Sequence, residues 1–206
     1  MRSASIDVDA QKCFTSLCPL ELPIPEGELI VDELNAQAAI ANFRLGSKDA
    51  HPENAIWIAN EEKPPLTPIS GKYFDLRWNK HAVPGTLGFE LLDGLPHPAD
   101  YDFFVWKGIE PDMHPYGVCY HDLTHSLSTG VIEYLNSQCV SIVFLGGLAF
   151  DYCVKTSALQ LINAGFTVVI NLAATRATSL EAYQHTIDYL SSKGVKFVKN
   201  TQELVR

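Results

Sequence analysis

The chain has 206 residues, 47% of them hydrophobic, so we expect a single globular domain over residues 1–206 with a sizeable core. Its formal net charge of −9 at pH 7 argues against a nucleic-acid partner, because such binding depends on lysines and arginines that neutralise phosphates. No apolar run approaches the roughly 20 residues that span a bilayer, and the N-terminus lacks the apolar core of a signal peptide, so a soluble cytoplasmic protein without a membrane partner is expected.

Apolar strands and amphipathic helices alternate along the chain. In chain order the pattern predicts a strand over 3–10, a helix over 26–43, a strand or loop over 53–60, an irregular Pro- and Gly-rich stretch over 60–100, a strand over 99–108, a helix over 130–138, a strand over 139–147, a helix over 153–166, a strand over 167–174, a helix over 179–194 and a strand over 195–200. Ser179 is expected to open the last helix, and Gly165 and Gly194 to close the last two. This alternation predicts a doubly wound α/β domain, with a mostly parallel sheet and helices on both faces.

Ligands of such sheets bind at the carboxyl ends of the strands, where Asp9, Lys107 and Cys153 are predicted to lie. Cys153 opens a helix, whose partial positive charge and free N–H groups favour a thiolate. A free cysteine is more often a small buried hydrophobic residue, and Asp9 or Lys107 alone could be an ordinary strand-end residue. Together, however, they offer a nucleophile, a proton acceptor and a balancing ammonium.

Two further features bear on the chemistry of this cysteine. The five cysteines are irregularly spaced and form no CxxC pair, which predicts free thiols rather than disulfides or a thiolate zinc site. In "GGLAFDYC", the glycines permit tight backbone geometry, so the N–H groups of Ala149 and Cys153 are candidates to hold a tetrahedral oxyanion.

A possible metal site is suggested by "KDAHPEN", in which Asp49 and His51 are two residues apart and point to one face of an extended segment. "WNKHAVPGT" adds His81 from the irregular stretch. One oxygen and imidazole nitrogens suit zinc, manganese or iron. Each histidine could equally be a surface or hydrogen-bonded side chain.

The motifs together resemble a known family. "DAQKCF", "WKG" and "GLAFDYCVKTSAL" are similar, in this order, to the aspartate, lysine and cysteine segments of the isochorismatase-like cysteine hydrolases. Within that superfamily the chain most resembles the nicotinamidases, or pyrazinamidases, which hydrolyse nicotinamide to nicotinate and ammonia. The resemblance implies the isochorismatase-like hydrolase fold, Asp9 as general base, Lys107 as the charged partner that helps lower the thiol pKa, and Cys153 as the nucleophile that forms a thioester. It also implies a cis peptide at Leu148–Ala149, a small-molecule amide substrate and a role in recycling nicotinamide for NAD.

The same resemblance bears on the metal. Nicotinamidases carry stretches similar to DWHPxxH and WPxHC, whose aspartate and histidines hold an ion that receives the pyridine nitrogen. Asp49, His51 and His81 match this pattern, which implies one divalent metal ion. The chain departs from it at Ala55, where the family has a further histidine.

Several alternatives remain open at this point. The ion could be completed by waters, Glu61 or Glu62 could replace the missing ligand, or the site could be empty. Phe14 and Trp78 are candidates to stack on a flat ring, with Tyr116 as a weaker one. The main alternatives to a nicotinamidase are a metal-free hydrolase of the same superfamily and a binding module that kept the fold. A homo-oligomer is possible.

Overall fold

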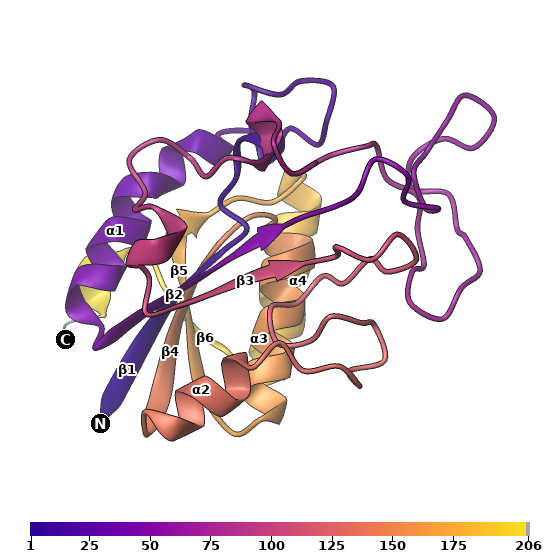
Figure 1. Ribbon diagram of the computed structural model, residues 1–206. Helices are drawn as coiled ribbons and strands as arrows, with labels where there is room; N and C mark the ends of the chain where they lie inside the picture. Colours follow the sequence, from indigo (N-terminus) through magenta and orange to yellow (C-terminus); the bar gives the residue numbers. More distant parts are fainter. Residues whose placement is uncertain (205–206) are drawn as a thin grey trace.

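The computed structural model describes residues 1–204, and its centre is a six-stranded parallel sheet with the order β3-β2-β1-β4-β5-β6 (Figure 1). The strands are β1 (Arg2–Val8), β2 (Phe43–Asp49), β3 (Phe103–Lys107), β4 (Val140–Gly147), β5 (Thr167–Thr175) and β6 (Lys196–Val198). The chain begins in the middle of the sheet, moves outward through β2 to β3, and then crosses to β4 on the other side of β1. This reversal is where open α/β sheets bind ligands.

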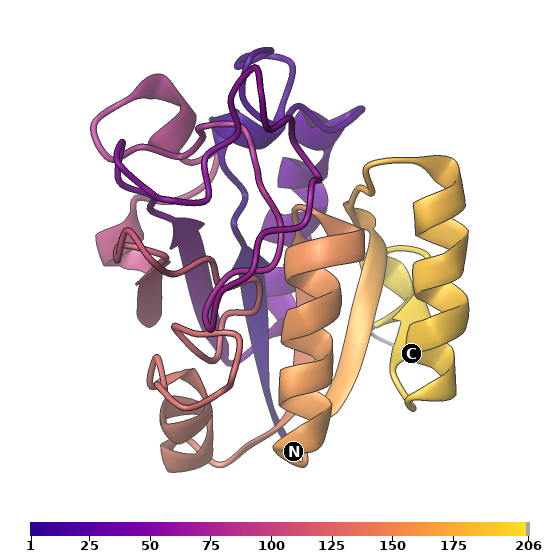
Figure 2. The same cartoon turned by 90° about the vertical axis from the view of Figure 1, so that its right-hand side faces the viewer.

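Helices cover both faces of the sheet, as the sequence predicted. The α-helices of the described residues are α1 (Val31–Ile40), α2 (Val131–Ser137), α3 (Lys155–Asn163) and α4 (Leu180–Ser192). Figures 1 and 2 show α1 on one side of the sheet and α3 and α4 on the other. A hydrophobic core lies on each face: one includes Leu135 of α2 and Leu161 of α3, and the other includes Leu34 of α1 and Ala174 of β5. The predicted doubly wound fold class is therefore confirmed.

The helix ends follow the predicted signals. The Ser179 hydroxyl accepts a hydrogen bond of 3.1 Å from the Ala182 N–H and caps α4. Gly165 and Gly194 have φ values of +93° and +88°, a left-handed conformation that glycine adopts without steric cost. The serine cap and the two glycines thus account for the start of α4 and for the ends of α3 and α4.

The predicted helix over 26–43 is wrong at both ends. A 3₁₀ turn over Gly27–Ile30 precedes α1, and Phe43 already begins β2. The strand β2 was not predicted, because charged residues and a glycine interrupt its apolar pattern. In the structure it lies between β1 and β3. The glycine, Gly46, has a packing role, because a Cβ there would lie only 2.6 Å from Cε2 of Phe104.

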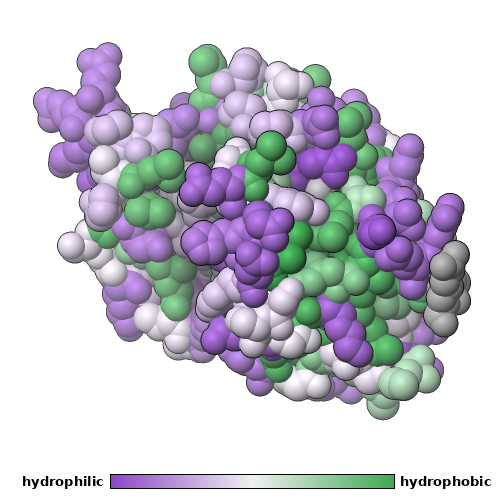
Figure 3. Space-filling view, turned by 180° about the vertical axis from the view of Figure 1, so that it is seen from behind, coloured by the Kyte–Doolittle hydropathy of each residue, from purple (hydrophilic) through white to green (hydrophobic). Residues whose placement is uncertain are grey.

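The stretch from 60 to 100 is irregular, as predicted. The segment over 53–60, left open as strand or loop, is a loop with a single bridge between Ile58 and Trp78. Seen from behind, the surface mixes hydrophilic and hydrophobic residues, with more hydrophobic surface on the right of the view (Figure 3). Within residues 1–204, no helix combines the length and the apolar character needed to cross a membrane.

Candidate active site

Four neighbouring strands deliver four reactive side chains to one edge of the sheet. Lys107 ends β3, Asp49 ends β2, Asp9 follows β1, and Cys153 lies in the turn after β4. Asp49 and Lys107 are partners in the register of β2 and β3. All four residues are buried, so the parallel register converts positions far apart in the sequence into one enclosed cluster.

Lys107 lies at the centre of this cluster. Its Nζ is 2.9 Å from Oδ2 of Asp9 and 3.8 Å from Sγ of Cys153, and it also forms an ion pair with Asp49. The Ser47 hydroxyl donates a hydrogen bond of 2.6 Å to Oδ1 of Asp9. Cys153, Asp9 and Asp49 each place one atom within 4.8 Å of the others. The structure therefore brings together the three residues that the sequence singled out as catalytic.

The electrostatics correct one expectation about the thiol. Burial raises the pKa of Cys153 well above its usual value; Lys107 opposes this effect, whereas Asp9 and Asp49 add to it. Lys107 thus lowers the thiol pKa, as the family resemblance implied. The thiolate that the helix start was expected to favour is nevertheless disfavoured, because desolvation and two carboxylates outweigh one ammonium. The resting group is a neutral thiol, and a base must take its proton during attack.

Asp9 has the electrostatic properties of such a base. Burial raises the pKa of Asp9 to about 6, Lys107 lowers it and Asp49 raises it. A carboxylate with this pKa is ionised at neutral pH and is still basic enough to accept a proton. Asp49 differs, because Lys107 and His51 overcome its burial and hold its pKa well below the ordinary range. The pKa of Lys107 is raised well above the ordinary value, since the neighbouring carboxylates outweigh its desolvation.

The backbone before Cys153 is tightly packed. Gly147 has a φ of +123°, and a Cβ there would lie 1.9 Å from the Val8 carbonyl oxygen, so only glycine fits. The Leu148–Ala149 peptide is cis, as the family resemblance implied. Cys153 then lies in a single π-helical turn over Phe150–Val154 that leads into α3. Among the described residues, the Ala149 N–H has no hydrogen-bond acceptor.

Beside this cluster, two predicted metal ligands face Asp49. Nδ1 of His51 lies 3.0 Å from the Gly108 carbonyl oxygen, and Nδ1 of His81 lies 2.7 Å from the Asn79 carbonyl oxygen. A carbonyl oxygen only accepts hydrogen bonds, so Nδ1 carries the proton in both rings. Their Nε2 atoms lie 3.6 Å and 3.7 Å from the Asp49 oxygens. Ligands of one ion with bonds near 2.1 Å lie about 3 to 4 Å apart, so the residues present fit a metal.

The sequence reasoning did not include His114, which lies beside these two histidines. One ring nitrogen from each of His51, His81 and His114 lies within 4.8 Å of the other two. Burial lowers the pKa of His51, and burial and the neighbouring imidazoles hold the pKa of His114 well below its usual value. Both rings are therefore neutral at pH 7 and have a lone pair for an ion.

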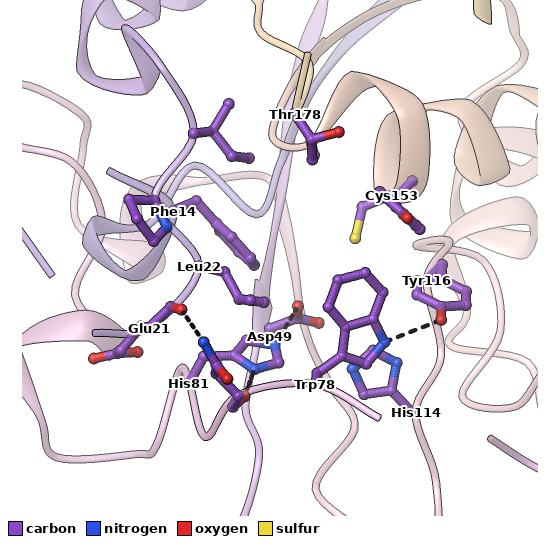
Figure 4. A pocket seen from close by; sticks show the side chains of 15 residues that line it. Phe14, Glu21, Leu22, Asp49, Trp78, His81, His114, Tyr116, Cys153 and Thr178 are labelled. Carbon is purple, nitrogen blue, oxygen red and sulfur yellow. Dashed lines mark hydrogen bonds and ion pairs between the residues drawn. The ribbon is translucent and has the colours of Figure 1, made fainter. Parts of the chain in front are cut away.

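A cavity of about 250 Å³ is lined by Cys153, His81 and His114. Its walls are mostly aromatic and aliphatic side chains: Phe14, Leu22, Ile24, Trp78, Tyr116 and Tyr152. In Figure 4 the Cys153 sulfur points into the pocket, with Phe14 on one side of the view and Trp78 on the other. The Trp78 indole N–H donates a hydrogen bond of 3.2 Å to the Tyr116 hydroxyl, which fixes the orientation of the indole ring.

The isochorismatase domain model matches residues 3–202. The chain belongs to the isochorismatase family. It is 27% identical over 206 residues to the nicotinamidase of Acinetobacter baylyi, and the alignment covers 98% of this chain and 94% of the relative. A structure of PnC1 from L. infantum in complex with nicotinate is 26% identical, with a TM-score of 0.81 over 96% of this chain and 92% of that chain. The pyrazinamidase of Pyrococcus horikoshii in complex with zinc is also 26% identical, with a TM-score of 0.74 over 96% of this chain and 99% of that chain. The protein is thus an isochorismatase-family hydrolase related to nicotinamidases.

The sequence contained no spacing signal for the additional histidine of this isochorismatase-family site. His114 follows β3 in an irregular segment and belongs to none of the motifs. Its backbone N–H donates to the Tyr73 carbonyl oxygen at 2.9 Å, a contact between two irregular segments. Glu61 and Glu62, which the sequence offered as replacement ligands, are exposed and lie outside the histidine cluster.

Proposed function

We propose that the protein hydrolyses a small aromatic amide, with nicotinamide as the first candidate, to the acid and ammonia. One observation carries the proposal. The Cys153 sulfur faces an aromatic pocket, and Lys107 lies behind it in contact with Asp9. This arrangement supplies a nucleophile, a base and a fixed positive charge at one point.

The reaction proceeds in two stages. In the first, Asp9 accepts the Cys153 proton as sulfur bonds to the amide carbonyl carbon, and the N–H groups of Ala149 and Cys153 stabilise the resulting oxyanion. Asp9 then gives the proton to the amide nitrogen, the C–N bond breaks, ammonia leaves and a thioester remains. In the second stage, Asp9 accepts a proton from water as its oxygen attacks the thioester, and the proton returns to sulfur as the acid is released. The net change is amide plus water to acid plus ammonia.

Asp49, His51 and His81 are proposed to hold one divalent ion, with zinc, manganese and iron as candidates. A divalent ion at this place, when bound, supplies a Lewis acid that can receive a ring nitrogen. Nε2 of His51 is buried and has no hydrogen-bond partner within the described part of the chain, which supports the assignment because such an atom is costly. A structure of the related pyrazinamidase in complex with zinc also supports it.

Phe14 and Trp78 are proposed to hold the flat ring of the substrate. Both side chains are almost fully buried yet line the cavity. Aromatic faces of this kind favour a planar heterocycle and position its carboxamide near the sulfur. The related protein that was crystallised with nicotinate supports a pyridine ligand of this shape.

The test is ammonia release from nicotinamide by the purified protein, as isolated, after chelation, and after zinc, manganese or iron is added back. Cys153→Ala should abolish release, whereas Cys139→Ala should not, because Cys139 is exposed and distant from the pocket. Wild-type release by Cys153→Ala would discard the thioester route. Release that survives chelation unchanged would favour the metal-free hydrolase, and no release by the wild-type protein would favour another amide or a binding module.

A further inference from the structure

We infer that His114 is a ligand of the metal ion in this chain, and that it takes the place of the imidazole that is missing at Ala55. The inference rests on the proposed metal site and extends it to a residue outside the family motifs. Its starting point is a buried histidine for which residues 1–204 provide no hydrogen-bond partner.

His114 is 3% exposed, and neither of its ring nitrogens has a hydrogen-bond partner among the described residues. An unpaired buried polar group costs on the order of 1 to 3 kcal/mol, so most such groups are satisfied. Nε2 of His51 is in the same situation. Two unsatisfied imidazoles beside the ring of His81 are accounted for together if one ion binds all three.

The surrounding rings hold His114 in a fixed orientation. Its ring is stacked on His51, with centroids 4.9 Å apart and an interplanar angle of 14°, and on Trp78, at 5.9 Å and 11°. Trp57 meets it edge to face at 4.4 Å. A ligand whose rotamer is fixed by packing loses little conformational entropy when it binds an ion. Figure 4 shows His114 beside Trp78, on the same side of the pocket as Asp49 and His81.

Position 55 has a different role in this chain. Ala55 is buried in a small apolar cluster with Trp57 and Trp78, the same two indoles that contact His114. The methyl group of Ala55 and the ring of His114 therefore pack against one pair of side chains. In this chain the candidate imidazole donor therefore lies in the segment after β3, whereas the family pattern has it in the segment after β2.

The decisive experiment separates a ligand from an aromatic filler. His114→Phe keeps a flat ring against the two tryptophans but has no nitrogen lone pair. Zinc and cobalt affinities of purified apo-protein would be measured by competition with a chromogenic chelator, and the bound metal counted by elemental analysis. We expect His114→Phe to bind at least about 100-fold more weakly than the wild-type protein, because even residues that only support a ligand cost 10- to 100-fold when lost. His185→Phe, an exposed histidine of α4, is the matched control and should bind as the wild-type protein does.

A second variant keeps the test valid if His114→Phe fails to fold. His114→Cys offers a thiolate at the same place, so its cobalt form should show a sulfur-to-cobalt charge-transfer band that is absent from the wild-type cobalt protein. Unchanged affinity in His114→Phe, or no new band in a folded and cobalt-loaded His114→Cys, would overturn the inference, as would a wild-type protein that binds no ion. Ammonia release is assayed separately, so loss of metal in His114→Phe with no turnover of nicotinamide by the wild-type protein would uphold this ligand and refute the proposed substrate.

Discussion

Replacing Asp9 with asparagine should slow ammonia release and, at the same time, make the Cys153 thiol easier to ionise. The substitution removes the proposed base, and general-base catalysis contributes about 10²- to 10⁴-fold, so ammonia release should fall by at least about 100-fold. It also removes one of the two carboxylates that raise the thiol pKa. The thiol should therefore ionise more easily in a protein that turns over more slowly.

The size of the pKa change follows from the geometry. An Asp9 oxygen lies within 4.8 Å of Sγ of Cys153. Two unit charges at that separation repel by about 3.5 kcal/mol at an effective dielectric constant of about 20, which corresponds to roughly 2.5 pKa units. The desolvation of the thiol is unchanged by the substitution. The alkylation profile of Cys153 should thus shift toward lower pH by about two units.

The assay is the rate of iodoacetamide alkylation as a function of pH. Peptide mass spectrometry is needed to separate Cys153 from the exposed Cys139. Asp93→Asn, which removes a carboxylate from an exposed side chain in a salt bridge with Lys12, controls for the change in net charge. An alkylation midpoint that stays in place or moves to higher pH would refute the electrostatic argument, and full ammonia release by Asp9→Asn would refute its role as base.

Three further predictions concern the metal site, stability and the pocket. Gly108→Ala should weaken zinc binding, measured by chelator competition, because the new Cβ would lie 2.3 Å from Cε1 of His51 and would displace that ring; unchanged affinity would contradict this placement of His51. Burial raises the pKa of Asp7 to about 6 despite its pairing with Arg44. Between about pH 4 and pH 6 the folded protein therefore holds a proton that the unfolded chain releases. The contribution of Asp7 to the free energy of unfolding should fall by about 3 kcal/mol as the pH rises through this range. Urea titrations should show this pH dependence in the wild-type protein, and the slope should be smaller in Asp7→Asn, which retains the similar contribution of Asp9; equal slopes in both proteins would count against the assignment. Trp78→Leu should raise the KM for nicotinamide more than it lowers kcat, since the indole is proposed to pack against the substrate ring rather than the reacting bond; a loss confined to kcat would assign it another role.

The fold and the clustering of the proposed catalytic residues were predictable for a physical reason. Strand and helix periods are local, and β4 and α3 carry strong apolar patterns, so the order of elements could be derived from the sequence. Once a parallel sheet is expected, residues at strand ends must meet at one edge, which placed Asp9, Lys107 and Cys153 together. The strand β2 was not predicted, because Gly46 and its charged neighbours interrupt the apolar pattern, although the strand lies between two others in the sheet.

The missed parts depend on contacts between irregular segments. His114 is held beside the other histidines by the hydrogen bond from its N–H to the Tyr73 carbonyl oxygen and by the packing of its ring on Trp57 and Trp78. No spacing rule describes such an arrangement. The effect of Lys107 on the thiol pKa was predicted correctly, but the net direction was not, because it depends on burial and on the distance of Asp49 from Cys153, which are three-dimensional properties.

The charge of the buried cluster explains how a thiol with a raised pKa can still serve as nucleophile. At neutral pH, Asp9 and Asp49 are ionised, Lys107 is protonated and Cys153 is neutral, so the cluster carries one net negative charge. Transfer of the thiol proton to Asp9 moves a charge from oxygen to sulfur without changing that total. Lys107 is in contact with both positions, at 2.9 Å and 3.8 Å, so it stabilises the negative charge before and after the transfer. In the proposed mechanism, attack therefore requires proximity to Asp9 and Lys107 and not a free thiolate at rest.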